Sequence, residues 1–313
     1  MLKTALLFAG QGAQYVGMGR DLAARFPAAG QWFERGREVL GLDLTAICFD
    51  GPEPELTRTE NAQPAIFLTS WAAFQLLKEH VPGLEFHATA GLSLGELTAL
   101  AAAGSFTFED ALRSARQRGR FMQEACDLTH GSMAAVLGLE AEALGPVCAE
   151  ADVEVANLNC PGQIVISGET ERIAKACDLA KAKGAKRAVL LPVAGAYHSR
   201  LMASAQPKVQ AMLEAVPLQA PSVPVISNVT ARPHGAPGDI RRRLAEQVIS
   251  PVRWEESVRY LLEQGFVRFI ELGPGTALSG FLKRIDKSAE ALHVADVSSL
   301  ETTVAALTRN HSN

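Results

Sequence analysis

Short apolar runs alternate with longer amphipathic stretches along most of the chain. Residues 4–9 read as a first buried strand, and residues 86–90 and 267–272 as two further strands. Between the first two of these strands, residues 20–80 are predicted to be helical, with breaks at proline- and glycine-rich positions. Helices placed between successive strands favour a mostly parallel sheet, so the predicted fold class is α/β.

The stretch from 129 to 196 follows a different order. Strands are expected at 132–137, 153–157, 163–167 and 187–193, with helices at 140–151 and 169–184. This βαββαβ order is that of ferredoxin-like folds. We therefore predict a small subdomain of residues 129–196, inserted into a large subdomain of residues 1–128 and 197–313. Residues 157–162, Asn-Leu-Asn-Cys-Pro-Gly, read as a tight turn between its two middle strands.

One predicted helix carries a charged residue on its apolar face. Ala111, Ala115, Arg118 and Met122 recur at spacings of 4, 3 and 4, so that they share one side of the helix. A buried guanidinium needs a carboxylate or phosphate partner. That partner is either internal, with Glu96 as the candidate, or the carboxylate of a ligand. For an arginine considered on its own, the internal partner is favoured.

The stretch Gly91-Leu92-Ser93-Leu94-Gly95 matches the Gly-x-Ser-x-Gly pattern of a nucleophile elbow. The serine of such an elbow lies on a sharp turn between a strand and a helix, and glycines two residues away tolerate the close approach of the backbone. A short apolar strand precedes the motif here, and helix-forming residues follow it. The pattern and its context favour a catalytic serine over an ordinary strand-to-helix turn.

Two other stretches stand out by their position. Residues 10–14, Gly-Gln-Gly-Ala-Gln, have three possible interpretations: a phosphate cradle, a loop that presents N–H groups to an oxyanion, or an ordinary turn. The sequence alone favours the ordinary turn. His198 is one of seven histidines and falls at the junction of the two predicted subdomains. A histidine at such a junction is well placed to line a cleft.

Composition narrows the class of protein. With 313 residues, 48% of them hydrophobic, the chain can bury a large core and a smaller one. The net charge of −4 argues against nucleic acid or an anionic membrane as a partner. Five scattered cysteines indicate neither a disulfide framework nor a metal site, and they favour a cytoplasmic location. No apolar run reaches the roughly 20 residues that a membrane span needs.

Taken together, these motifs and several others resemble the malonyl-CoA:acyl-carrier-protein transacylases of fatty-acid synthesis and the related acyltransferase domains of polyketide synthases. The resemblance covers essentially the whole chain. Its pieces are residues 8–14, 61–65, 91–96, 118–123, 157–163, 195–199, 247–254 and 271–275. It implies a large subdomain of the α/β-hydrolase type with the ferredoxin-like subdomain inserted.

The resemblance also implies a role for each matching residue. Ser93 is the expected nucleophile, and His198 is its general base and then general acid. A backbone carbonyl orients the histidine in this family, and Gln247 occupies the matching place. The backbone N–H groups of Gln11 and Leu94 are expected to form the oxyanion hole.

Substrate choice is assigned in the same way. Arg118 matches the arginine that pairs with the free carboxylate of the malonyl group, which replaces the internal partner favoured above. Many relatives carry histidine where this chain has Leu92. Tyr197 stands where an aromatic residue is usual in malonyl-specific relatives, and we interpret it as favouring malonyl over methylmalonyl. Asn157 and Asn159 are further candidates for the lining of the pocket.

The implied reaction is ping-pong transfer of malonyl from malonyl-CoA to the phosphopantetheine thiol of holo acyl carrier protein, with no metal or resident cofactor and with a monomeric enzyme. Two alternatives stay open. A serine esterase of the α/β-hydrolase type would use Ser93, then Glu271 or Asp286, then His293. A non-catalytic module would dock acyl carrier protein without ever becoming acylated at the serine.

Overall fold

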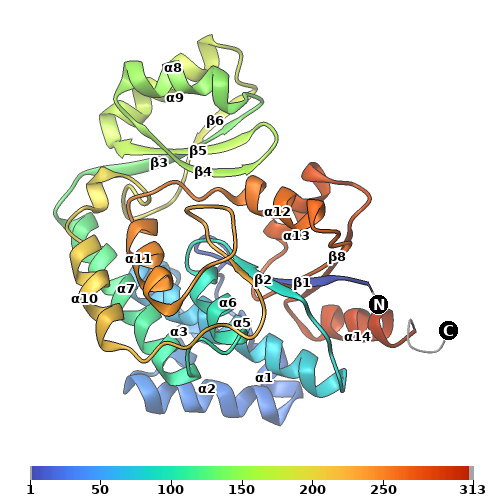
Figure 1. Ribbon diagram of the computed structural model, residues 1–313. Helices are drawn as coiled ribbons and strands as arrows, with labels where there is room; N and C mark the ends of the chain where they lie inside the picture. Colours follow the sequence, from blue (N-terminus) through green and yellow to red (C-terminus); the bar gives the residue numbers. More distant parts are fainter. Residues whose placement is uncertain (1, 310–313) are drawn as a thin grey trace.

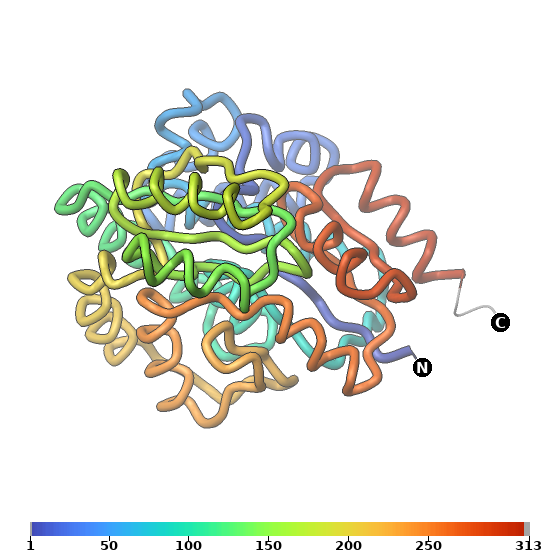
Figure 2. Tube along the Cα trace, turned by 90° about the horizontal axis from the view of Figure 1, so that it is seen from above, coloured from blue at the N-terminus to red at the C-terminus, as the bar shows by residue number. Residues whose placement is uncertain are grey.

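The computed structural model describes residues 2–309. Figure 1 shows two parts, a large subdomain and a small one that caps it. In the view from above in Figure 2, the helices of the small subdomain run side by side over the centre of the molecule. Among the described residues, no helix is both long and apolar enough to cross a membrane.

A five-stranded parallel sheet forms the centre of the large subdomain. Its strands stand in the order β7 (Val225–Ile226), β2 (Ala88–Gly91), β1 (Thr4–Phe8), β8 (Arg268–Leu272) and β9 (Glu290–Val294). The order is not that of the chain, so helical segments return each strand to its neighbour. This agrees with the α/β class predicted from the sequence.

Strand β1 shows why both faces of this sheet are covered. Every residue of the strand is buried. Leu6 and Phe8 pack into the core that contains α5 (Thr59–His80), whereas Ala5 and Leu7 pack into a second core on the other face. A strand that alternates between two apolar layers is apolar throughout, which is the pattern from which it was predicted.

The remaining helices of the large subdomain surround these two layers. They are α1 (Arg20–Arg25), α2 (Pro27–Leu40), α3 (Leu44–Asp50), α4 (Glu53–Thr57), α6 (Gly95–Ala102), α7 (Phe108–Asp127), η1 (Arg200–Met202), α10 (Gln206–Ala215), α11 (Pro237–Gln247), α12 (Trp254–Glu263), α13 (Ala277–Ile285) and α14 (Val297–Arg309). The breaks expected between residues 20 and 80 fall between α1 and α5. The single helix expected near residues 200–215 is divided into η1 and α10.

Helix α5 begins at Thr59 and has Pro64 inside it. A proline in a helix removes one N–H, so the carbonyl four residues earlier loses its partner. That carbonyl belongs to Glu60, and the guanidinium of Arg116 donates a hydrogen bond to it at 2.6 Å. The proline is therefore accommodated by a side chain from α7.

The small subdomain has the ferredoxin-like order expected from the sequence. Its elements are β3 (Gly131–Leu137), α8 (Ala141–Ala151), β4 (Glu154–Cys160), β5 (Gln163–Glu169), α9 (Thr170–Ala182) and β6 (Arg187–Leu190). They form an antiparallel sheet in the order β4-β5-β3-β6, with α8 and α9 on the face away from the large subdomain (Figure 1). These strands lie inside the boundaries proposed for the subdomain.

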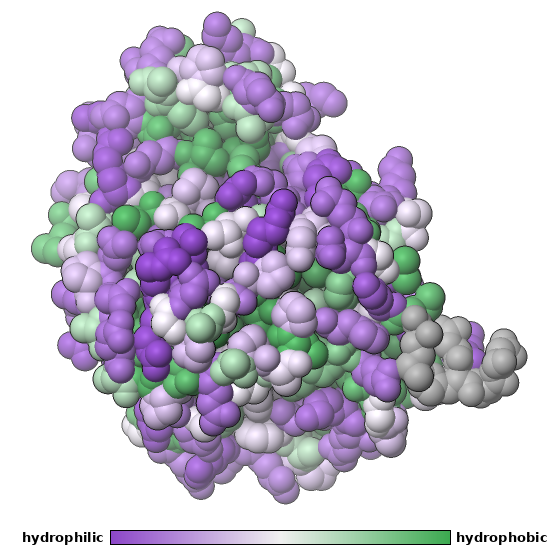
Figure 3. All heavy atoms as spheres, in the orientation of Figure 1, coloured by the Kyte–Doolittle hydropathy of each residue, from purple (hydrophilic) through white to green (hydrophobic). Residues whose placement is uncertain are grey.

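One detail of this subdomain differs from the expected turn. Residues 157–160 belong to β4, and only Pro161 and Gly162 form the turn. Strand β4 also bonds to the large subdomain, since the N–H of Leu158 donates to the carbonyl of Val252 at 2.9 Å. Pairing with β5, up to Cys160 opposite Gln163, carries the strand to residue 160. Hydrophobic residues gather on the lower part of the small subdomain, where it meets the large one (Figure 3).

Candidate active site

Ser93 lies on the sharp turn between β2 and α6, with a left-handed backbone at φ 52°. The two glycines of the motif are required by packing. A Cβ at Gly91 would lie 1.9 Å from the carbonyl carbon of Gly95, and one at Gly95 would lie 2.2 Å from the carbonyl oxygen of Phe8. No side chain fits at such distances, so the turn that exposes the serine depends on both glycines.

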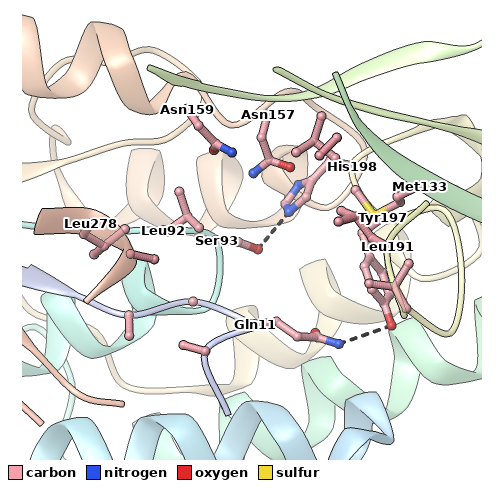
Figure 4. Close-up of a pocket in the computed structure, with 18 of the residues that line it drawn as sticks. Gln11, Leu92, Ser93, Met133, Asn157, Asn159, Leu191, Tyr197, His198 and Leu278 are labelled. Carbon is pink, nitrogen blue, oxygen red and sulfur yellow. Dashed lines mark hydrogen bonds between the residues drawn. The ribbon is translucent and has the colours of Figure 1, made fainter. Parts of the chain in front are cut away.

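The serine hydroxyl meets a histidine that is 105 residues away in the chain. Ser93 Oγ lies 2.8 Å from His198 Nε2, as Figure 4 shows. On the other side of the ring, His198 Nδ1 lies 2.8 Å from the backbone carbonyl oxygen of Gln247. A carbonyl only accepts hydrogen bonds, so Nδ1 carries the proton and Nε2 is free to accept the serine proton. This arrangement orients a general base without an acidic side chain.

The environment keeps His198 neutral. Burial lowers the pKa of His198 from 6.5 to about 4, and the positive charge of Arg118 acts in the same direction. At neutral pH the imidazole is therefore unprotonated and ready to accept a proton. Burial and the charge of Arg118 also make the imidazolium a strong acid once it has formed, and a strong acid readily returns its proton to a leaving group.

Two backbone N–H groups beside Ser93 have no partner. Neither Gln11 nor Leu94 donates its backbone N–H to any acceptor within residues 2–309. Leu94 is the N-cap of α6, so its N–H lies at the positive end of a helix. The loop that carries Gln11 is held close to the elbow, because a Cβ at Gly10 would lie 2.4 Å from the carbonyl oxygen of Leu92. Unpaired donors of this kind suit a developing oxyanion.

Arg118 extends from α7 toward Ser93 and is almost wholly buried, with 3% of its surface exposed. Its guanidinium donates to Gln63 Oε1 at 2.7 Å, to Gln247 Oε1 at 2.8 Å and to Ser93 Oγ at 3.1 Å. Burial lowers its pKa to about 10, and the charge of Glu96 opposes that shift. Arg118 is thus a buried cation with neutral hydrogen-bond acceptors, and Glu96 acts on it only from a distance.

A cavity of about 240 Å³ opens beside the serine and the histidine (Figure 4). The predicted site residues that line it are Gln11, Leu92, Ser93, Asn157, Asn159, Tyr197 and His198, together with residues such as Met122, Met133 and Phe281. Leu94, Arg118 and Gln247 lie behind this lining. Both subdomains contribute to the cavity, because Met133 and Ala135 point to it from β3 while Ala134 and Val136 point to the core of the small subdomain.

The Tyr197 hydroxyl lies at the edge of this cavity, between two side chains. It is hydrogen-bonded to Thr59 Oγ1, and Gln11 Nε2 donates to it at 3.3 Å (Figure 4). The ring is buried, with 5% exposed. The tyrosine therefore connects α5 to the loop that carries one of the two unpaired N–H groups.

Three polar residues support the site, and of these sequence reasoning had singled out only Glu96, as a possible internal partner of Arg118. Asn228 Oδ1 accepts from the N–H of Ser93 at 2.6 Å, and Asn228 Nδ2 donates to the carbonyl of Gly91 at 2.8 Å. Gln63 and Glu96 contact the arginine and the amide of Gln247, respectively. Asn228 follows β7 at the carboxyl edge of a parallel sheet, and that placement is a signal that could have identified it.

The residues that an esterase triad would need do not come together at Ser93. His293 lies on β9 and is not one of the described residues that line the cavity. Glu271 accepts hydrogen bonds from the N–H groups of Leu278 at 3.0 Å and Ser279 at 2.7 Å, so it caps α13. Asp286 accepts from Ser288. The histidine that reaches Ser93 is His198.

Comparisons with known proteins agree with this geometry. The family described as "Acyl transferase domain" matches residues 5–313. The malonyl CoA-acyl carrier protein transacylase of Bacillus subtilis (strain 168) is 44% identical over 318 residues, covering 100% of both chains. The transacylase structure from Coxiella burnetii has a TM-score of 0.94 at 35% identity, covering 97% of both chains.

A second solved structure includes a carrier protein. It is a malonyl-transacylase in complex with its holo type II polyketide synthase (PKS) acyl-carrier protein, with a TM-score of 0.94 at 40% identity, covering 97% of this chain and 99% of that one. The matches extend over both subdomains and include the elbow. The chain therefore belongs to the acyl transferase family, among the malonyl CoA-acyl carrier protein transacylases.

Proposed function

We propose that this protein transfers the malonyl group of malonyl-CoA to the phosphopantetheine thiol of acyl carrier protein, through a malonyl ester on Ser93. The observation that carries the proposal is the meeting of three groups at one point. Ser93 Oγ lies 2.8 Å from His198 Nε2 and 3.1 Å from the guanidinium of Arg118. A nucleophile, its base and a cation for a carboxylate are thus within reach of one acyl group.

In the first half-reaction His198 Nε2 takes the proton of the Ser93 hydroxyl while Oγ attacks the thioester carbonyl carbon. The negative charge that develops on the carbonyl oxygen is stabilised by the backbone N–H groups of Gln11 and Leu94. The carbon–sulfur bond then breaks, and the imidazolium gives its proton to the departing CoA sulfur. Free CoA leaves, and the malonyl ester remains on the serine.

The second half-reaction runs through the same atoms. The thiol of phosphopantetheine gives its proton to His198 and attacks the ester carbonyl. The carbon–oxygen bond to Ser93 breaks, and the imidazolium returns a proton to Oγ. The phosphopantetheine is supplied by the carrier protein, so the chain itself needs no metal or resident cofactor. The product provides malonyl units for fatty-acid or polyketide chain extension.

Arg118 is proposed to select the malonyl group. A guanidinium has five N–H donors, and three hydrogen bonds are made to described residues, so two donors remain for a substrate carboxylate. The buried charge makes such a pair stronger than a contact with an amide oxygen. Tyr197 lines the cavity, which supports its proposed role in disfavouring methylmalonyl, and Leu92 gives an apolar wall beside the serine.

Intact-protein mass spectrometry tests the proposal. Brief mixing with malonyl-CoA should add one malonyl mass to the wild-type protein and to Ser298→Ala, a matched control at an exposed serine, but not to Ser93→Ala. A malonyl adduct that persists in Ser93→Ala would overturn the assignment. A protein that binds acyl carrier protein and never forms an adduct would support the docking module instead.

The working form is proposed to be a cytoplasmic monomer. A single chain supplies Ser93, His198, Arg118 and the carbonyl of Gln247, so a second copy is not needed to complete the site. All five cysteines are free and buried, which suits a reducing compartment. Light scattering on the active protein should give a mass near 33.4 kDa, whereas twice that mass would contradict the monomer.

A further inference from the structure

Glu96 is a buried carboxylate that the proposed mechanism does not use. It lies in the first turn of α6, three residues after the nucleophile, with none of its surface exposed. Three donors converge on it: the Gln247 side-chain amide at 2.8 Å, the backbone N–H of Asn228 at 2.9 Å, and His234 Nε2 at 2.7 Å. A buried carboxylate with three donors is held in one position, and its charge is stabilised by them.

The contacts of Glu96 lead directly to the arginine. Gln247 Nε2 donates to Glu96 Oε2, and Gln247 Oε1 accepts from Arg118 at 2.8 Å. Because a carboxylate only accepts, the amide of Gln247 must turn its N–H₂ to Glu96 and its oxygen to Arg118. One amide group therefore separates a buried anion from a buried cation. A direct ion pair would have occupied the guanidinium, whereas this spacing leaves two of its donors unused.

We propose that Glu96 is the resident counter-charge of Arg118, placed one amide away so that it balances the buried cation in the empty site and leaves the guanidinium open to the carboxylate of a substrate. The proposal rests on the function proposed above. It makes Glu96 a residue that acts through Gln247 and Arg118 and does not touch the acyl group. His234, which holds the other carboxylate oxygen, and Asn228 fix its orientation.

A specific consequence follows for substrate preference. A malonyl carboxylate bound to Arg118 carries the same sign of charge as Glu96, and at an assumed separation of about 10 Å the two charges repel. At an effective dielectric of about 20 to 40, this repulsion corresponds to about four- to fifteenfold in rate or affinity. An acetyl group carries no charge and does not experience it. Removing the charge of Glu96 should therefore increase the preference for malonyl over acetyl.

The variant Glu96→Gln tests this directly, because it removes the charge and nearly preserves the shape. Its amide oxygen can still accept from Gln247 and Asn228, and its amide N–H₂ can donate to His234 Nε2 after a change of tautomer. Acylation of Ser93 by malonyl-CoA and by acetyl-CoA is measured separately by quenched-flow mass spectrometry. The expected result is a malonyl-to-acetyl ratio of kcat/KM about four- to fifteenfold above that of wild type.

A purely structural role would give a different result. If Glu96 only braced the elbow, Glu96→Gln would slow both acyl groups by the same factor, and if it mainly positioned Arg118, malonyl would lose more than acetyl. Either outcome overturns the proposal. Glu96→Asp, which keeps the charge and shortens the side chain, is the matched control, and its ratio should stay within about twofold of wild type. Wild-type malonylation is measured beside it, so failure of the proposed function is recognised separately.

A second measurement does not depend on activity. Arg118→Met alone leaves the carboxylate of Glu96 buried without its counter-charge, whereas Arg118→Met combined with Glu96→Gln removes both charges. The double variant should melt at a higher temperature than Arg118→Met. The Glu96→Gln single variant completes the cycle: if this change alters the melting temperature by the same amount in wild type as in Arg118→Met, the two charges are independent and the proposal fails.

Discussion

Replacing Arg118 by methionine removes the guanidinium and keeps most of the apolar stem. The residue is fully enclosed, so the stem fills space that a smaller side chain would leave empty. Three hydrogen bonds are lost, to Gln63, Gln247 and Ser93. These losses, and the relief of the positive field on His198, affect every acyl group alike. Only the pairing with a substrate carboxylate is specific to malonyl.

The size of that specific loss follows from the kind of bond. A hydrogen bond to a charged group contributes about 1.5–3 kcal/mol, which is roughly ten- to 150-fold in kcat/KM. Acylation of Ser93 in Arg118→Met should therefore slow by that factor more with malonyl-CoA than with acetyl-CoA. Arg118→Lys keeps the charge but not the bidentate fork, and its ratio should lie between those of wild type and the methionine variant.

The assay is single-turnover acylation followed by intact mass, with the two acyl-CoA substrates at matched concentrations and with circular dichroism to confirm that the variants are folded. The reported quantity is the ratio of the two rate constants. If both substrates lose the same factor, Arg118 does not bind the malonyl carboxylate, and its role is confined to the serine and the histidine. If acylation by acetyl-CoA slows more than acylation by malonyl-CoA, Arg118 does not favour malonyl and the assignment is wrong.

Three further predictions concern the base, the elbow and the oxyanion loop. Because the pKa of His198 is lowered to about 4, the acylation rate should be level from about pH 5 to pH 8 and should fall only below that range; a midpoint near 6.5 in a pH–rate profile would contradict it. Gly91→Ala places a Cβ 1.9 Å from the carbonyl carbon of Gly95, so acylation should be lost and the free energy of unfolding, measured by urea titration, should fall by several kcal/mol. Near wild-type stability would refute the packing argument. Tyr197→Phe removes one of the two acceptors of the Gln11 side-chain amide, the other being Thr59 Oγ1, so kcat should fall severalfold for malonyl and acetyl alike with KM unchanged. A change confined to KM would argue against a role in the oxyanion loop.

The sequence predicted the elbow and the alternation of strands and helices because these depend on local rules. Gly91 and Gly95 are required by backbone clashes within one turn, and β1 is largely apolar because both its faces are covered. The inward position of Arg118 also followed from spacing on a single helix. The ferredoxin-like order followed from the order of elements alone.

What the sequence could not give depends on contacts between distant segments. Pro64 argues against a helix at its position, and α5 runs through it only because the Arg116 guanidinium donates to the freed carbonyl. Strand β4 also bonds to the backbone of Val252, which follows it by about ninety residues, and its spacing alone does not show that contact. Asn228 carries no motif, and its contact with the N–H of Ser93 exists only because β7 pairs with β2.

The partner of Arg118 shows the same limit. Spacing indicated a buried cation but left Glu96 and a ligand carboxylate as alternatives. The structure places the amide of Gln247 between the two charges, so Glu96 is near the guanidinium without being its direct partner. The spacing of residues along one helix cannot show that a side chain from another helix lies between the two charges.

The measurement that tests the central claim most directly is transfer from the isolated acyl-enzyme. Protein malonylated at Ser93 is freed of malonyl-CoA by rapid gel filtration and mixed with holo acyl carrier protein, and both masses are followed in time. The account predicts that the malonyl mass leaves the enzyme and appears on the carrier protein in equal amount, far faster than it is lost in buffer. Loss to water at the same rate with and without carrier protein would contradict it and would identify a hydrolase.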